Sequence, residues 1–545
     1  MTASSTGRQP FKRSIGAAAA AAAMSVGALI WPSLSQAAPA VRLSWQDFAQ
    51  DPKNVESLRK AVAVMKARNA APQTSPEFRK SWTYWANMHG YFGPQSPFGT
   101  LAANEQRVSA KDLKYFKGIA DATPPDQVAT DVWAQCQHGT PWFFAWHRLY
   151  LYYFEKQLQE ASGNPDLHLP YWDYTNPSQL KMPAEFTKPT YVDGTGKKQG
   201  NPLYESRRAP GWQTGKQSLN TNSTNIDSAL MKQKTFTGYQ DAIENNVHGY
   251  IHCTVAVTCP VTDMGSVPYS SNDPIFWVHH ANIDRMWSCW TNLQGNSNPT
   301  DPTFLNKQFA FINADGQEVT NKVSDLFGGG LIDYKYEQEV NCARTASTHL
   351  AAEEQNMTNR AGQAPMAAGS ARNPPGSARL LNAPTKPLLL TKSKNSLHVD
   401  FVQAEEQKPL QGLASSGNAA VRTETVLTLR DISFKAHPGT MFNVYLQSAG
   451  DPKKKLQVGT LSFFTVPPGV GGHHGDAAHQ HPSTGLTREF DVTDALRSLD
   501  GGSRKGVTVS FEATTGREGD QDVPAVNEAA QLTVGGIDFQ VRPPQ

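Results

Sequence analysis

The segment Asn272-Asp-Pro-Ile-Phe-Trp-Val-His279-His280-Ala-Asn-Ile-Asp284-Arg285 carries the most informative pattern in the sequence. It lies within residues 273–293, which we expect to form a helix. Asp284 follows His280 by about one helical turn, and a metal-bound imidazole usually donates its second N–H to a carboxylate or a carbonyl. The segment therefore predicts a helix with a metal-binding histidine, and Asp284 is placed to receive its N–H group.

A second histidine pair lies upstream, in His248-Gly-Tyr-Ile-His252. Residues four apart share one face of a helix, so both imidazoles can bind one metal ion. Glu244 extends the same face by another turn. A zinc peptidase motif requires Glu directly after the first His, and Gly249 occupies that position. The zinc peptidase interpretation therefore fails, although the pattern still predicts a metal site.

A further set of histidines comprises His89, His138 and His147. Pro141 should interrupt any helix between the last two, which predicts His138 on a loop and His147 at the start of the next helix. The chain thus holds two sets of three histidines in a region with helical character. All-imidazole ligation suits copper, zinc, iron or nickel, so the residues alone leave the metal open.

Residues 80–295 resemble the two copper-binding motifs of the tyrosinase and polyphenol oxidase family. The matching pieces, besides the two segments quoted above, are Cys136-Gln-His138-Gly, Trp146-His147-Arg148 and Leu169-Pro-Tyr-Trp-Asp173. The resemblance implies two copper ions, CuA and CuB, with O2 as co-substrate, and the oxidation of o-diphenols to o-quinones. Some members also hydroxylate monophenols. The implied ligands are His89, His138, His147, His248, His252 and His280, the last in preference to His279, with Phe276 and Asp284 beside the cofactor.

The same resemblance suggests roles for residues around the copper ligands. Cys136 stands where fungal and molluscan members form a thioether to the histidine two residues later; the alternative is a free buried thiol. Glu244 matches the glutamate that orients a water molecule, and the alternative is a solvated helix carboxylate. Gly249 favours catechol oxidation, whereas Val267, in place of a bulky gate residue, favours larger or monophenolic substrates. The subtype therefore stays open.

The remaining sequence predicts two domains joined by a linker. We expect a mainly α catalytic domain at 41–344, a four-helix bundle with long loops, and helices at 52–68, 75–88, 144–161 and 237–253, with 177–234 as a loop. Residues 345–390 are rich in Ala, Gly, Pro and Ser, which predicts an exposed linker. Residues 391–545 predict a β-sandwich, with strands at 421–434, 440–448, 457–466, 506–513 and 530–541.

Parts of this second domain resemble the C-terminal β-domain of plant-type polyphenol oxidases, chiefly Glu424–Ser433 and Met441–Tyr445. Tyr334-Lys-Tyr336 also matches the tyrosine pair that closes the catalytic core in that group. The resemblance implies a domain that covers the mouth of the active site and keeps the enzyme latent until it is displaced or cleaved in the linker.

Composition and the N-terminus limit the partners and the compartment. The net charge of +2 over 545 residues argues against nucleic acid or an anionic membrane as partner. Residues 1–38 combine basic residues with a short, alanine-rich apolar run, which predicts a cleaved export signal and a periplasmic or secreted protein; Sec and twin-arginine export both remain open. Disulfides are then permitted. With Cys136 assigned to the thioether, Cys253 with Cys259 and Cys289 with Cys342 are available as pairs.

Two other classes of function remain as alternatives. One is an O2 carrier like the hemocyanins, and the other is an interaction protein with structural zinc. A glycine-rich stretch also contains His473, His474, His479 and His481. A polar loop is the simpler interpretation of that stretch, and transient copper loading is the other. A phenolic small molecule is the expected substrate, while its identity and the oligomeric state stay open.

Overall fold

The structure is a computed structural model that describes residues 39–91, 109–120, 122–133, 135–257, 259, 262–340, 342, 379–380, 387–392, 395–400, 424–448, 451, 453–464, 486–499, 506–518 and 526–542. The predicted export signal and the His473–His481 stretch lie outside these residues. Among the residues described, no helix is both long enough and apolar enough to cross a lipid bilayer.

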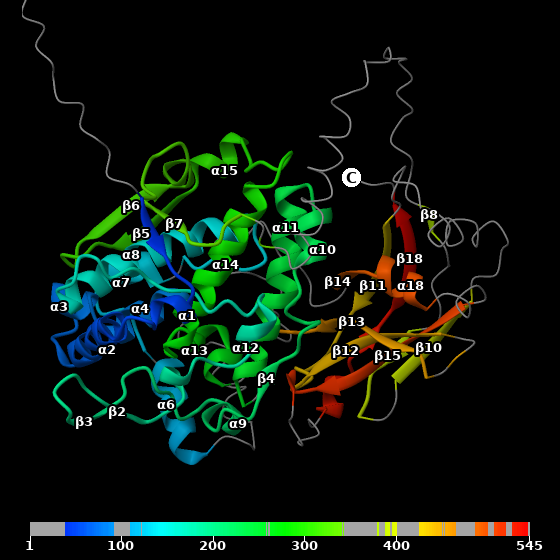
Figure 1. Cartoon of the computed structure of the whole chain (residues 1–545), viewed down its shortest axis with the longest axis horizontal. Coiled ribbons are helices and arrows are strands. Elements are labelled where there is room, and N and C mark those ends of the chain that lie inside the picture. Colours follow the sequence, from blue (N-terminus) through cyan, green and yellow to red (C-terminus); the bar gives the residue numbers. More distant parts are fainter. Residues whose placement is uncertain are drawn as a thin grey trace, which may run out of the picture. The chain divides into compact units, whose positions relative to one another are not determined.

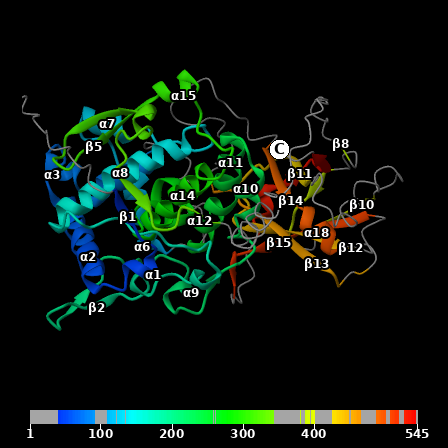
Figure 2. The same cartoon turned by 45° about the horizontal axis from the view of Figure 1, so that its top comes forward.

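The first part of the chain is mainly helical, as predicted (Figure 1). Its two longest helices, α8 and α14, pack against each other, and α8 also packs against α2 (Figure 2). Their inward faces form one aromatic-rich core. The helices are α1 (Trp45–Phe48), α2 (Pro52–Ala67), α3 (Pro76–Arg79), α4 (Trp82–Gly90), α6 (Ala110–Ala120), α7 (Gln127–Trp133), α8 (Phe143–Ser162), α9 (Pro210–Gln213), α10 (Asp227–Lys232), α11 (Phe236–Ala242), α12 (Gly249–Val255), α13 (Val267–Ser270), α14 (Ile275–Thr291) and α15 (Pro302–Asn306).

Local sequence explains where several of these helices begin and end. Asp51 caps the N-terminus of α2 by accepting from the backbone N–H of Lys53, and α8 ends at Gly163, whose φ of 68° favours glycine. The prediction of a single helix at 75–88 is wrong, because this range contains two helices, α3 and α4. Ser81 accepts a hydrogen bond from the backbone N–H of Tyr84 and starts a new helix there, which separates α3 from α4.

Two other predictions need correction in detail. The helix expected at 237–253 consists of α11, a π-helical turn η4 (Ile243–His248) and α12. π-Helical turns inside α-helices are rare and occur often at functional sites. The segment 177–234, predicted as loop, contains α9, α10, the strands β2 (Thr190–Val192) and β3 (Lys198–Gly200), and β4 (Ser218–Leu219).

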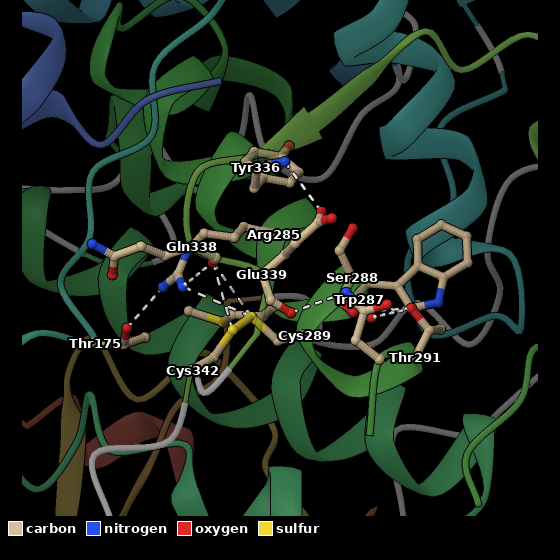
Figure 3. The surroundings of a disulfide bond; sticks show 12 residues. Thr175, Arg285, Trp287, Ser288, Cys289, Thr291, Tyr336, Gln338, Glu339 and Cys342 are labelled. Carbon is tan, nitrogen blue, oxygen red and sulfur yellow. Dashed lines mark hydrogen bonds between the residues drawn. A yellow bond between two sulfur atoms is a disulfide. The ribbon is translucent and has the colours of Figure 1, made fainter. Parts of the chain in front are cut away.

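A parallel strand pair closes the helical domain near its two ends. β1 (Ala40–Arg42) pairs with β7 (Tyr334–Tyr336), the predicted tyrosine pair. Beyond β7, the disulfide Cys289–Cys342 joins α14 to the following chain (Figure 3). Beside it, Arg285 donates to the carbonyl of Gln338 and to the hydroxyl of Thr175. The structure also contains the disulfide Cys253–Cys259, so both expected pairs are present. A hairpin of β5 (Gln308–Ile312) and β6 (Glu318–Lys322) completes this domain.

The second part of the chain is rich in strands, as predicted (Figure 1). One antiparallel sheet has the order β10-β15-β12-β13 and the other β14-β11-β18-β8, and apolar side chains of both share one core. The strands are β8 (Arg379–Leu380), β9 (Leu388–Leu389), β10 (Asn395–Asp400), β11 (Glu424–Ile432), β12 (Met441–Ser448), β13 (Lys455–Leu461), β14 (Leu486–Asp491), β15 (Gly506–Thr514), β16 (Arg517–Glu518), β17 (Thr533–Val534) and β18 (Gly536–Arg542), with the short helix α18 (Thr493–Ser498) after β14.

The predicted linker extends too far toward the C-terminus. β8 pairs with β18, and β9 pairs with β17, so both strands belong to the β-domain although they lie within 345–390. The composition of that range gave no strand signal because each strand has only two residues. The β-domain also adds a strand to the helical domain, since β16 pairs with β4.

Candidate metal centre

Two histidine clusters lie in the core of the helical domain. His89, His138 and His147 form one cluster with Cys136, and their candidate ligand atoms lie within 4.8 Å of one another. The other cluster contains His248, His252, His279 and His280 under the same limit. The histidines come from α4, the loop before α8, α8 itself, the junction of η4 with α12, and α14. The structure thus brings together all six predicted ligands, three in each cluster.

Backbone carbonyls fix the orientation of four of these imidazoles through Nδ1. The Nδ1 atoms of His147 and His252 lie 2.7 Å from the carbonyl oxygens of Phe143 and Met264. Those of His89 and His248 lie 3.1 and 3.2 Å from the carbonyl oxygens of Val267 and Glu244. Because a carbonyl oxygen can only accept, Nδ1 carries the proton in each ring. The lone pair of each ring is therefore on Nε2, where it can bind a metal ion.

In three of these four rings the Nε2 lone pair has no hydrogen-bond partner, and the rings are neutral. The Nε2 atoms of His89, His147 and His248 are buried without a hydrogen-bond partner. Burial, followed by the neighbouring imidazoles, lowers the pKa of these three histidines well below its ordinary value. Neutral, buried, uncompensated imidazole nitrogens are costly unless they bind something. A set of such donors fits copper, which accepts imidazole readily.

The two clusters are direct neighbours. The rings of His147 and His280 stack with centroids 4.7 Å apart, and the rings of His138 and His248 are 6.0 Å apart. Phe276 lies at the junction, with its ring 4.6 Å from that of His89 and 4.2 Å from that of His280. One turn of α14 therefore places an aromatic ring against both clusters, and the role predicted for Phe276 beside the cofactor stays a prediction.

His279 and His280 both belong to the second cluster, but their nitrogens differ in environment. Nε2 of His280 lies 3.3 Å from Nε2 of His252, so these two nitrogens face each other. Nδ1 of His279 is engaged with the hydroxyl of Tyr174 at 2.8 Å. Nε2 of His279 is buried without a hydrogen-bond partner, so both histidines are candidate ligands of the second cluster.

The predicted contact between Asp284 and His280 is wrong. The carboxylate of Asp284 accepts hydrogen bonds from the hydroxyls of Tyr334 and Tyr336, both 2.7 Å away, and from Nε of Arg148 at 2.5 Å. Nδ1 of His280 has no hydrogen-bond partner. Helical spacing placed Asp284 one turn from His280 but could not indicate that β7 would bring two tyrosines to the same carboxylate.

Cys136 and Glu244 lie beside the clusters. Sγ of Cys136 is 3.4 Å from Nδ1 of His138, and it is the cysteine outside the two disulfides. Glu244 is buried, and its Oε1 accepts the backbone N–H of Gly139 at 2.6 Å. Its Oε2 is buried without a partner. Burial raises the pKa of Glu244 to about 8. A solvated helix carboxylate is thus excluded for Glu244.

The two positions expected to control substrate choice contact other parts of the protein. Val267 is buried, and its carbonyl holds His89. Gly249 faces the β-domain: a Cβ atom there would lie 2.5 Å from Oγ of Ser462 and 3.6 Å from Cβ of Phe464. Both residues therefore have packing roles that their place in the sequence motif did not reveal.

Phe464 is the main feature that sequence reasoning missed. It follows β13 in the β-domain, and its ring stacks on that of His252 with centroids 3.9 Å apart and an angle of 9° between the planes. The ring is also 5.5 Å from that of His248. Phe464 falls in a predicted strand, but no local pattern indicates that the side chain leaves its own domain. The resemblance to latent enzymes was the available signal that some residue would cover the site.

Comparison with known proteins agrees with this site. Residues 79–293 match the family model "common central domain of tyrosinase", and residues 377–524 match a domain of unknown function, DUF7868. A tyrosinase of Hahella sp. is 30% identical over 314 residues, which cover 51% of this chain and 59% of the relative. The latent, chloroplastic polyphenol oxidase of Prunus armeniaca is 25% identical over 485 residues, 82% of this chain and 72% of the relative.

The fold is similar to that of a latent plant enzyme. The structure of latent apple tyrosinase matches with a TM-score of 0.53 and 19% identity, and covers 93% of this chain and 98% of its own. The family uses two copper ions with O2, and the two histidine clusters fit that pair. Residues 79–293 therefore carry the common central domain of tyrosinase, and the chain is similar over most of its length to a latent plant polyphenol oxidase.

Proposed function

We propose that this protein is a latent polyphenol oxidase that oxidises o-diphenols to o-quinones with O2. The observation that carries the proposal is the pair of adjoining clusters with buried, uncompensated Nε2 atoms. Two bound copper ions supply the electron transfer between phenol and O2. The proposed ligands are His89, His138 and His147 for CuA, and His248, His252 and His280 for CuB.

The surrounding side chains would hold the ligands and receive the proton of the substrate. The carbonyls at Nδ1 keep the imidazoles in one tautomer and one orientation, so little reorganisation is needed on metal binding. Glu244 carries an uncompensated Oε2 inside the core. We assign it the role of holding a water molecule that accepts the phenol proton, because phenols ionise near a pKa of ~10 and bind better as phenolates.

We also propose that Cys136 is joined to His138 by a thioether, which supports one ligand covalently. Sγ of Cys136 lies 3.4 Å from Nδ1 of His138, so a ring carbon bonded to that nitrogen is within reach. Formation of the C–S bond removes the thiol hydrogen and the ring C–H hydrogen as two protons and two electrons, which the co-substrate O2 would accept. Phe464 keeps the enzyme latent, because its ring covers the face of His252 that an aromatic substrate would otherwise approach. Residues 1–38 are proposed to direct export.

The test uses the full chain loaded with copper. O2 uptake and quinone formation from catechol are measured before and after limited proteolysis between residues 343 and 378. We expect little quinone before cleavage and rapid formation after it. Reversible O2 binding without quinone after cleavage would instead identify an O2 carrier, and preferential zinc binding without an O2-dependent absorption change would identify a structural site. Rates on tyrosine and on L-DOPA then separate the two substrate subtypes.

A further inference from the structure

One short segment supplies hydrogen-bond acceptors to both histidine clusters. The carbonyl of Met264, in the 3-10 turn η5 (Asp263–Gly265), holds Nδ1 of His252 at 2.7 Å. Three residues later, the carbonyl of Val267 holds Nδ1 of His89 at 3.1 Å. Since these contacts set the ring orientation of one ligand in each cluster, the placement of the segment determines where both Nε2 atoms point.

The segment has little regular structure of its own to hold it. It consists of a single 3-10 turn followed by the one-turn helix α13. Asp263, at its start, has a positive φ of 28°, a conformation that costs energy for a residue other than glycine. Such a backbone persists only when its surroundings enforce it. The side chain of Asp263 shows what enforces it here.

Asp263 is held by an arginine from a distant part of the chain. Nε of Arg207 lies 3.1 Å from each carboxylate oxygen of Asp263, whose side chain is 1% exposed. Arg207 is fixed in turn by Glu205, 2.6 Å from its Nη2, and by the ring of Tyr115, 3.7 Å below its guanidinium. The Arg207–Asp263 pair therefore connects α6, through Tyr115, and the segment around Glu205 to the backbone immediately before Met264.

A covalent link restrains the other side of the same loop. The disulfide Cys253–Cys259 begins at the residue after His252 and shortens the path to Asp263. His252 is thus held from α12, while the carbonyl that orients its ring is held through Arg207. A change at Arg207 would move the carbonyl without removing the histidine.

We propose that Arg207 and Asp263 are positioning residues for His252, and that they act through the Met264 carbonyl. The proposal rests on the proposed function in that it takes His252 as a metal ligand. Without the ion pair, the carboxylate of Asp263 would be buried and unpaired. The turn would then relax, because this relieves both the burial of the unpaired charge and the positive φ of Asp263. The Met264 carbonyl would then move from Nδ1, and the imidazole would lose its fixed tautomer and orientation.

The experiment measures metal binding and not turnover, so its outcome is independent of the test of enzyme activity. The apo form of the full chain is titrated with Co²⁺, whose visible spectrum reports ligand geometry. The rate at which Co²⁺ is released to a chelator is then measured. Arg207→Ala and Arg207→Lys are compared with Arg79→Ala. The side chain of Arg79 is 18% exposed, close to the 19% of Arg207, and forms an ion pair of 2.7 Å with Asp126. No contact joins this ion pair to the histidines that the structure describes.

For Arg207→Ala we expect one of the two Co²⁺ ions to leave about 10- to 100-fold faster, with a changed spectrum, as is usual when a residue behind a metal ligand is lost. Arg207→Lys keeps a cation and should give an intermediate rate, and His252→Ala sets the upper limit. If Arg207→Ala only lowers the melting temperature, while spectrum and release match those of Arg79→Ala, the pair is merely structural and the proposal is overturned. Failure of quinone formation in the wild type would leave this comparison unaffected.

Discussion

The ring of Phe464 lies flat on the imidazole of His252, with centroids 3.9 Å apart and planes at 9°. The two residues belong to different domains and are separated by more than two hundred positions in the sequence. Stacked aromatic pairs contribute ~0.5–1.5 kcal/mol beyond the burial of their surface. An aromatic substrate must therefore displace this contact before its own ring can occupy the same face.

Replacement of Phe464 should activate the uncleaved protein. Phe464→Ala removes the ring and leaves β13 in place, so we expect catechol oxidation by the uncleaved chain to rise at least ~10-fold, the equivalent of ~1.4 kcal/mol. Phe464→Leu, which retains part of the side-chain volume, should give a rate between those of the wild type and Phe464→Ala. Initial rates before and after proteolysis measure this effect. An unchanged ratio of the two rates in Phe464→Ala would show that another contact maintains latency.

Side chains at Gly249 should compete with docking of the β-domain. A Cβ atom there meets Oγ of Ser462 at 2.5 Å. Rotation of Ser462 relieves this contact but breaks its hydrogen bond to the carbonyl of Asn245. We therefore expect a small activation of the uncleaved chain in Gly249→Ala and a larger one in Gly249→Val.

The control for this series is a background without the serine hydroxyl. In Ser462→Ala, the change Gly249→Ala should have little further effect on the ratio of uncleaved to cleaved rates, because the contacting oxygen is gone. Equal activation by Gly249→Ala in both backgrounds would mean that position 249 acts on the substrate and not on docking.

Much of the site could be predicted because its residues follow one another in recognisable patterns. The i,i+4 pair His248 and His252 and the segment around His280 lie on helices, where spacing in the sequence translates directly into direction in space. Pro141 correctly indicated that the helix α8 begins after His138. These inferences required only local structure.

The errors at Asp284 and in the linker, together with the contacts that were missed, share the opposite property, since each concerns a partner outside its own helix or strand. Asp284 binds Tyr334 and Tyr336, which β7 brings from fifty residues away, in place of the nearby His280. Phe464 and the Met264 carbonyl reach the histidines through the packing of whole segments. The strands β8 and β9 are too short to produce an alternating pattern, so only their pairing identifies them.

Arg517 should help to hold the β-domain in place. Its guanidinium Nη1 lies 3.2 Å from the carbonyl oxygens of both Thr254 and Ala256, at the end of α12. A hydrogen bond from a charged group contributes about 1.5–3 kcal/mol. We expect Arg517→Ala to raise the rate of the uncleaved chain ~10-fold and to leave that of the cleaved chain unchanged. Arg497→Ala, which removes a partly exposed arginine paired with Asp494 in the same domain, serves as control and should change neither rate.

Acid should destabilise the helical domain through Glu155. Burial by itself would raise its pKa, but Arg42, whose Nε lies 2.9 Å away, and hydrogen bonds from His168 and from the backbone of Leu169 together lower it to about 2. Because the folded pKa is below the unfolded value of 4.5, Glu155 stabilises the fold above pH 4.5 and loses this effect as the pH falls toward 2. The loss amounts to ~3 kcal/mol. Urea midpoints of the apo protein between pH 6 and pH 3 should show about 2 kcal/mol of this loss, because pH 3 still lies above the folded pKa.

Glu155→Gln provides the decisive comparison for this carboxylate. The amide cannot ionise, so the variant should lose the part of the acid sensitivity that arises at Glu155. It should also be less stable at pH 6, by about 3–5 kcal/mol, because the buried guanidinium of Arg42 loses its closest carboxylate. Asp284 lies 3.6 Å from Arg42 and can compensate only in part, since it already accepts from Arg148 and two tyrosines. A Glu155→Gln variant with the wild-type dependence of the urea midpoint on pH would place the acid-sensitive group elsewhere.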